Sequence, residues 1–177
     1  RRWPCVDLDD RSFEDLKASL RLQVDSGFDS LTVFGLLTAS SWLPDLQRTV
    51  PATRRRRVRV LLDEAHRLGL KIMIKPHIAY WGSPFAWRGE IAFDTEEQWR
   101  RFFETYERWI TMVARLAKDC DAFVVGTELD RTVHRADDWR RVIAAVRSRF
   151  GGHMTYAANW THYEQVPFWD ALDVIGI

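Results

Sequence analysis

The chain repeats one pattern of apolar and polar positions along most of its length. Each repeat contains an amphipathic helix that closes on glycine, a short loop, and a run of β-branched apolar residues. The first predicted helix covers about residues 12–26, carries its apolar side chains on one face, and ends at Gly27. Helices that alternate with nearly continuous apolar strands are typical of a parallel sheet covered by helices.

The same pattern predicts the remaining elements. A second helix ends at Gly69, and a third begins near Asp94, where Asp94 and Glu97 form a predicted capping pair. The third helix has a predicted buried stripe of Trp99, Phe102, Phe103, Tyr106, Trp109, Val113 and Leu116. The fourth helix carries Trp139, Val142, Val146 and Phe150. The predicted strands are 31–34, 70–75, 122–126, 153–158 and 173–177.

Two folds of the α/β class combine parallel strands and helices in this order, the doubly wound sheet and the (β/α)8 TIM barrel. No glycine-rich phosphate loop follows a predicted strand, and polar and aromatic residues concentrate after the strand ends, where barrel enzymes keep their active sites. Because a complete barrel takes about 250 residues, we expect residues 1–177 to form one incomplete barrel domain, truncated at both ends. The five strands are then the second to the sixth, and the first, seventh and eighth lie outside the chain.

The composition indicates a folded globular chain. Hydrophobic residues make up 46% of it and charged residues 29%, and 26 basic against 25 acidic side chains leave a formal net charge of +1. We therefore expect no disorder, no nucleic-acid partner held by excess charge and no membrane partner, since no apolar run is long enough to cross a bilayer. The arginines at 54–57 open an amphipathic helix, and we interpret them as its solvated face.

Neither a metal nor a cofactor is expected. Cys5 and Cys120 are too few for a disulfide framework or a zinc knuckle. His134, His153 and His162 share no ligand spacing with a carboxylate or a thiol.

Candidate site residues follow the predicted strands. They combine one carboxyl group with basic, amide, imidazole and indole side chains: Lys75, His77, Trp81, Trp87, Arg88, Glu128, Asn159 and Trp160. Glycoside hydrolysis needs a carboxylic acid to protonate the leaving oxygen, polar groups to bind hydroxyls, and aromatic faces to cover sugar rings.

Each candidate also has a structural interpretation. Glu128 follows an apolar strand and is our candidate general acid, but it can equally pair with Arg131 or cap the next helix. His77 binds a sugar hydroxyl or is a core histidine, and Asn159 binds a hydroxyl or is a turn residue. The indoles of Trp81, Trp87 and Trp160 are candidate sugar platforms, whereas Trp99, Trp109 and Trp139 lie on helix stripes and are expected in the core.

Five collinear blocks of the chain resemble glycoside hydrolase family 113, a family of bacterial (β/α)8 enzymes known chiefly as endo-β-1,4-mannanases. The blocks are residues 74–77, 87–91, 123–129, 155–160 and 168–177. The resemblance implies a retaining mechanism on a β-linked oligosaccharide or polysaccharide, with Glu128 as acid/base at the end of the fourth strand. It also implies a second glutamate, the nucleophile, at the end of a seventh strand beyond Ile177.

Two other functions compete with this one. A barrel that binds carbohydrate without cleaving it, or that belongs to a phage, shares the fold, since fold alone does not imply function. A phosphate-binding barrel enzyme is the third reading, and it requires a glycine-rich loop outside the given chain.

Overall fold

The computed structural model describes residues 5–7, 13–27, 29–38, 52–79 and 85–177. The strands are β1 (Cys5–Asp7), β2 (Ser30–Thr38), β3 (Lys71–Ala79), β4 (Ala122–Thr127), β5 (His153–Ala157) and β6 (Val174–Gly176). The α-helices are α1 (Phe13–Asp25), α2 (Ala52–Arg67), α3 (Glu96–Leu116) and α4 (Ala136–Arg147). Short 3₁₀ helices are η2 (Arg88–Glu90), η3 (Asp130–Thr132), η4 (Tyr163–Gln165) and η5 (Trp169–Ala171).

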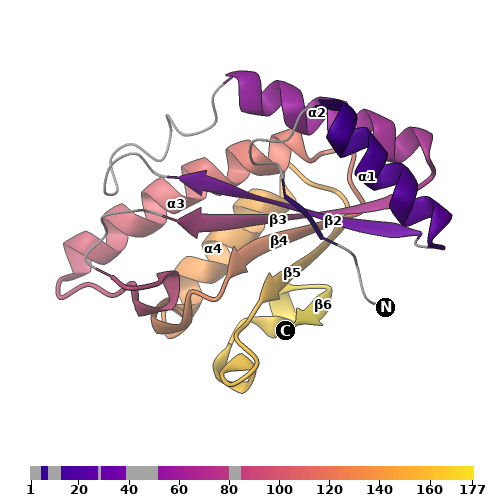
Figure 1. Ribbon diagram of the computed structural model, residues 1–177. Coiled ribbons are helices and arrows are strands. Elements are labelled where there is room, and N and C mark those ends of the chain that lie inside the picture. The colour runs from indigo at the N-terminus through magenta and orange to yellow at the C-terminus, as the bar shows by residue number, and fades with distance from the viewer. Residues whose placement is uncertain (1–4, 8–12, 28, 39–51, 80–84) are drawn as a thin grey trace.

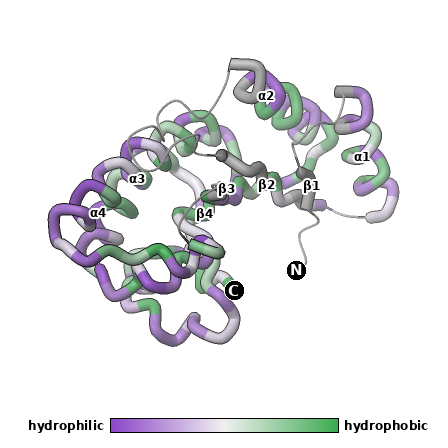
Figure 2. The backbone as a smooth tube through the Cα atoms, turned by 60° about the vertical axis from the view of Figure 1, so that its left-hand side comes forward, coloured by the Kyte–Doolittle hydropathy of each residue, from purple (hydrophilic) through white to green (hydrophobic). Residues whose placement is uncertain are grey.

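The strand order identifies the fold. All six strands are parallel and lie side by side in chain order, β1-β2-β3-β4-β5-β6 (Figure 1). A doubly wound sheet reverses its order at a switch point, and this sheet does not. The helices α4, α3, α2 and α1 follow one another in an arc outside the strands (Figure 2). This winding in one direction is that of a (β/α)8 barrel, and the described part is an incomplete one.

The structure corrects the expected position of the first strand. We expected that strand outside the chain, but β1 pairs with β2 in register, Val6 beside Val33. β1 is only three residues long, which is too short for an apolar run to stand out from its polar neighbours. The described part of the chain therefore contributes six strands to the sheet instead of the predicted five.

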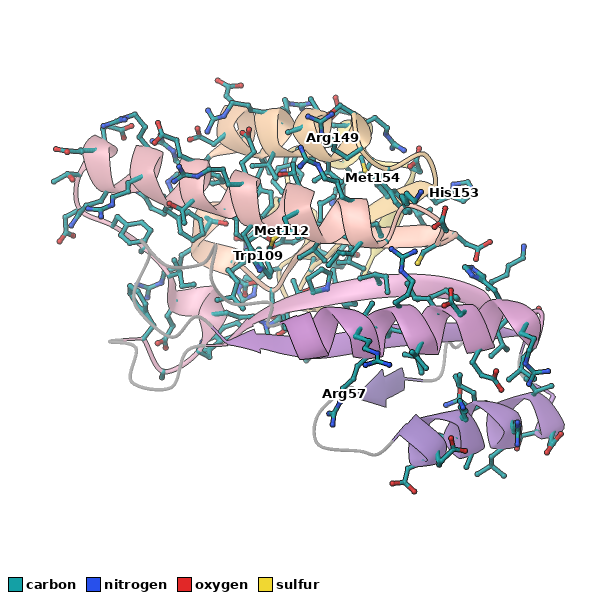
Figure 3. All side chains as sticks on the ribbon, turned by 90° about the horizontal axis from the view of Figure 1, so that it is seen from above. Arg57, Trp109, Met112, Arg149, His153 and Met154 are labelled. Atoms are coloured by element: carbon teal, nitrogen blue, oxygen red, sulfur yellow. The ribbon has the colours of Figure 1, made fainter. Side chains whose placement is uncertain are left out.

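Helix α3 supplies most of the aromatic core, as its apolar stripe predicts. Trp109, labelled in Figure 3, is fully buried, and Phe102, Phe103 and Tyr106 are buried with it. Trp99 is 6% exposed, whereas the last residue of the predicted stripe, Leu116, is only partly buried. The prediction that Trp99, Trp109 and Trp139 are core residues is confirmed.

The cap of α3 lies one residue later than predicted. Thr95, and not Asp94, is the N-cap, and its hydroxyl accepts a hydrogen bond from the Gln98 backbone N–H. The Gln98 side chain in turn accepts from the Thr95 backbone N–H, which completes a capping box. A capping pair needs two side-chain acceptors three residues apart, and the sequence offers Asp94 with Glu97 and Thr95 with Gln98 in adjacent registers.

One extra residue in β4 sets the direction of the chain where that strand ends. Val124 pairs with Thr155 and Thr127 with Ala157, so three steps along β4 match two along β5. Such a β-bulge changes which face the following side chains occupy. A Cβ on Gly126 would lie 2.6 Å from the Trp139 ring of α4, on the helix side of the sheet.

Two aspartates join neighbouring strands at the opposite, N-terminal edge. Asp121, just before β4, accepts a hydrogen bond from the Ile72 backbone N–H of β3 at 2.8 Å. Asp173, just before β6, accepts one from the Met154 N–H of β5 at 2.7 Å, and the Arg147 guanidinium lies 2.5 Å from the same oxygen. This edge of a barrel contributes stability, whereas the C-terminal edge carries the chemistry.

We predict that Gly126→Ala lowers the free energy of unfolding by about 1–3 kcal/mol, the usual cost of overpacking a core. The added methyl group would lie within 3 Å of the buried rings of Trp139 and Tyr156, which cannot both move away. Urea unfolding of the wild type and the variant measures the difference. Gly151→Ala is the control, because nothing lies within 4 Å of its Cβ position. Equal losses in the two variants would contradict the packing argument.

We predict that Asp173→Asn destabilises the protein at neutral pH and that the difference from wild type disappears in acid. Burial alone would raise the pKa of Asp173, but the hydrogen bonds from Arg147 and from the Met154 amide outweigh it and lower this pKa. A lowered folded-state pKa stabilises the protein above the unfolded value of about 3.9, and the stabilisation is lost as the pH falls through the folded value. Thermal unfolding of both proteins at a series of pH values from 7 to 3 measures the difference in their stability.

Asp119→Asn, at an exposed loop position, is the control for this series and should follow the wild type. A gap between wild type and Asp173→Asn that stays constant down to pH 3 would show that the charge of Asp173 does not carry the effect.

Candidate active site

The C-terminal ends of β3, β4 and β5 meet at one edge of the sheet. Thr127 of β4 pairs with Ala157 of β5, and its hydroxyl donates a hydrogen bond to the Pro76 carbonyl of β3 at 3.2 Å. The residue after Thr127 is Glu128, which the sequence predicted as the general acid. The structure therefore places Glu128 at the edge where barrel enzymes carry their chemistry.

Glu128 has an uncommon backbone conformation. Its φ is +49°, and among the described non-glycine residues it is the one with a positive φ. Residues other than glycine adopt this left-handed backbone conformation at a cost in free energy, and residues that do so concentrate at functional sites. Two hydrogen bonds to β5 hold the conformation: the Glu128 N–H donates to the Ala157 carbonyl at 2.8 Å, and the Leu129 N–H donates to the Tyr156 hydroxyl at 2.7 Å.

The carboxylate of Glu128 is paired with Arg88. The Arg88 Nη2 atom lies 2.5 Å from Glu128 Oε2, and the two side chains are 23% and 34% exposed. The sequence offered Arg131 as the structural partner of Glu128, but Arg131 is exposed. Arg88 was predicted to bind substrate, and the contact that the structure gives it is with the candidate acid.

The turn before Arg88 is packed by an indole. Trp87 is extended and precedes η2, and its ring covers Gly89, where a Cβ would lie 2.1 Å from a ring atom. The Glu90 carboxylate accepts a hydrogen bond from the Ala86 N–H at 2.9 Å, which closes the turn. Trp87 remains 38% exposed, so part of its indole stays accessible.

A second acidic residue lies near Glu128, and sequence reasoning missed it. Asp130 is the first residue of η3, and its Oδ2 atom lies 3.1 Å from Nδ1 of His162. Burial raises the pKa of Asp130, with a further contribution from Glu128, while His162 and Arg88 act to lower it. The sequence signal for Asp130 was its position two residues after Glu128. An aspartate at such a position is usually interpreted as the start of a helix.

Three other predicted site residues, Lys75, His77 and Trp160, lie on or after the strands of this edge and differ in exposure. Lys75 and His77 are partly buried on β3, and they alternate with Ile72 and Ile74, which face the helix-side core. Trp160 is 76% exposed in the loop after β5. Trp81 lies outside the described residues.

Asn159 shapes the loop after β5. Its Oδ1 atom accepts hydrogen bonds from the Thr161 backbone N–H at 3.2 Å and from the Thr161 hydroxyl at 2.9 Å. This is an Asx-type turn, one of the two roles that the sequence allowed for Asn159. The Thr161 hydroxyl lies 2.9 Å from Nδ1 of His162, so the turn also connects to the Asp130 pair.

The described part of the chain contains neither a metal-binding cluster nor a membrane-spanning helix. No group of three or more His, Cys, Asp or Glu side chains there could hold a metal ion. No helix among the same residues is both long and apolar enough to cross a membrane.

Comparisons with solved structures agree with the strand order. A structure described as a complex of a family 113 β-1,4-mannanase aligns with a TM-score of 0.85 and 30% identity, over 98% of this chain and 60% of that one. The β-mannanase AaManA from Alicyclobacillus acidocaldarius, in complex with ManMIm, aligns with a TM-score of 0.80 and 30% identity, over 92% of this chain and 54% of that one. The chain thus spans less than two thirds of the length of these structures.

More distant structures share the fold alone. A family 5 subfamily 18 protein from Streptomyces cattleya, in complex with GlcNAc, aligns with a TM-score of 0.61 at 17% identity, over 88% of this chain and 43% of that one. A search of curated protein sequences gives no match.

The sequence model of Glycoside Hydrolase Family 113 matches residues 44–177, about three quarters of the chain. That span includes β3 to β6 and every predicted site residue. The chain therefore belongs to glycoside hydrolase family 113.

Proposed function

We propose that the full-length protein is a retaining glycoside hydrolase that cleaves β-1,4-linked mannan, with Glu128 as its general acid/base. The observation that carries the proposal is the placement of Glu128 after β4, in a left-handed conformation at the C-terminal edge of a family 113 sheet. The mannan substrate is supported by the names of the two structures at 30% identity, a β-1,4-mannanase and a β-mannanase.

The proposed reaction has two steps and needs no cofactor. In the first, protonated Glu128 donates its proton to the glycosidic oxygen, while a second carboxylate attacks the anomeric carbon and displaces the leaving sugar. In the second, ionised Glu128 removes a proton from a water molecule, which attacks the anomeric carbon and frees the nucleophile. The resemblance to the family assigns the second carboxylate to a glutamate beyond Ile177, at about 5–5.5 Å from the acid/base carboxyl.

Arg88 acts on the first step through its contact with Glu128. When Glu128 has given up its proton, the guanidinium 2.5 Å away balances the negative charge that remains. The contact also restricts the carboxylate to one orientation, which a proton donor needs for a defined approach to the glycosidic oxygen.

The remaining candidates divide into sugar platforms and hydroxyl-binding groups. Trp87 and Trp160 are exposed indoles next to the edge and suit the apolar faces of sugar rings. Lys75 and His77 offer donors to sugar hydroxyls from β3. Asn159 already uses its side-chain oxygen within the loop, so its amide N–H₂ group is the part proposed for substrate.

We predict that Glu128→Gln lowers hydrolysis of β-1,4-mannan by about 10²–10⁴-fold, the usual contribution of a general acid/base. Glutamine keeps the size of the side chain but has no acidic proton to donate. Release of reducing sugar from mannan measures the loss, with cellulose and xylan as comparison substrates. Glu164→Gln, which changes an exposed glutamate of η4 in the same way, is the matched control.

Azide tests the retaining mechanism with Glu128→Ala. This anion needs no general base, so it should attack the glycosyl-enzyme intermediate and release β-mannosyl azide from an activated aryl mannoside. Near-normal activity of Glu128→Gln on mannan contradicts the assignment of the acid/base. A wild type that binds mannan without cleaving any of the polymers favours a non-catalytic barrel.

A further inference from the structure

Tyr156 lies beneath the backbone of Glu128 and is fully buried. Its ring packs against Trp139 and Phe168, with centroid distances of 5.3 and 5.5 Å and interplanar angles of 76° and 90°. Trp169 is 6.1 Å away on a further side. Rings packed edge to face on several sides fix the ring of Tyr156, and with it the position of its hydroxyl group.

The hydroxyl of Tyr156 binds the peptide group that follows Glu128. The Leu129 N–H donates to it at 2.7 Å, and the Glu128 N–H donates to the carbonyl of the next β5 residue, Ala157, at 2.8 Å. The amides on both sides of the Glu128 Cα atom are therefore held by one strand. Because φ of Glu128 is +49°, an unfavourable angle for a residue with a side chain, these two bonds oppose its relaxation.

We propose that Tyr156 is a positioning residue for the general acid/base: its hydroxyl holds the Leu129 amide and thereby keeps Glu128 in the conformation that presents its carboxyl to the glycosidic oxygen. This inference rests on the proposed function of Glu128. Tyr156 acts through the backbone and needs no contact with substrate. Burial raises the pKa of Tyr156, so the hydroxyl stays neutral throughout the working pH range.

The chain offers a matched control for removal of this hydroxyl. Tyr106 of α3 is equally buried, and its hydroxyl donates to the Val125 carbonyl of β4 at 2.8 Å. Each tyrosine hydroxyl thus makes one buried hydrogen bond to the backbone of β4 or of the residues that directly follow it. Tyr106 does so three residues before Glu128, and Tyr156 one residue after it.

The test uses two substrates that differ in their need for an acid. Manno-oligosaccharides have a poor leaving group that must be protonated, whereas a dinitrophenyl β-mannoside releases a stable phenolate without a proton. The value of kcat/KM reports the first irreversible step, which is cleavage of the glycosidic bond. A displaced acid lowers kcat/KM for the first substrate and spares the second, whereas general loss of structure lowers both.

We expect Tyr156→Phe to lower kcat/KM on manno-oligosaccharides by about 10–100-fold, the scale of a misplacement near 1 Å. On the dinitrophenyl mannoside the value should stay within about threefold of wild type, since that bond breaks without general acid help. Tyr106→Phe should change the two values together, if at all. All assays are run below the thermal unfolding transition of the least stable variant.

A second substitution removes the donor and leaves every ring in place. Replacement of Leu129 by its α-hydroxy acid analogue turns the amide into an ester, which has no N–H to give to Tyr156. It should show the same selective loss that we expect of Tyr156→Phe, and it keeps the proposal testable if Tyr156→Phe fails to fold. Parallel losses on the two substrates in the ester variant, or losses no larger than in Tyr106→Phe, overturn the proposal.

The experiments distinguish failure of the acid/base assignment of Glu128 from failure of the positioning role of Tyr156. If the wild type is active and Glu128→Ala is rescued by azide while the ester and Tyr156→Phe behave like Tyr106→Phe, the acid/base assignment stands and the role of Tyr156 is refuted. If the wild type cleaves neither substrate, the proposed function fails first, and with it the inference built on it.

Discussion

The pairing of β4 with β5 is the constraint on which the candidate site depends. Parallel strands normally advance in equal steps, but β4 carries one more residue than its partner between Val124 and Thr127. The extra residue turns the end of the strand, and the chain continues into Glu128 with a positive φ. This register positions the two acceptors on β5, the Ala157 carbonyl for the Glu128 N–H and the Tyr156 hydroxyl for the Leu129 N–H.

Charge at this edge is arranged around one close pair. Arg88 comes from the turn after β3 and Glu128 from the end of β4, so their contact joins two segments 40 residues apart. Asp130 and His162 form a second pair beside it, between the segments after β4 and after β5. Together the two pairs connect the loops after three consecutive strands, and they do so where a sugar chain would have to lie in a barrel enzyme.

The sequence predicted the helices, five of the six strands, the barrel and the family, because each rests on a pattern that local residues carry. Apolar stripes at helical spacing gave α3 and its buried tryptophans, and the blocks around His77 and Glu128 gave the family resemblance. The three-residue strand β1 and the register of the α3 cap were missed, since their signals are short or duplicated.

The bulge, the hydroxyl bond of Tyr156 and the pairing of Asp130 with His162 depend on contacts between distant segments. Spacing along one strand shows no such contact. Tyr156 in particular reads in the sequence as one more apolar strand residue. The assignment of Glu128 and of the sugar-binding side chains stays a prediction.

The left-handed backbone of Glu128 sets stability against the acid/base role proposed for this residue. Glycine adopts a φ near +49° without the steric cost that a side chain incurs there, although it also loses more freedom on folding. Random substitution followed by selection for heat resistance alone would therefore tolerate, and in part favour, the loss of the carboxyl group at residue 128. Under the proposed function, selection for acid/base catalysis is what keeps a glutamate in a conformation that suits glycine better.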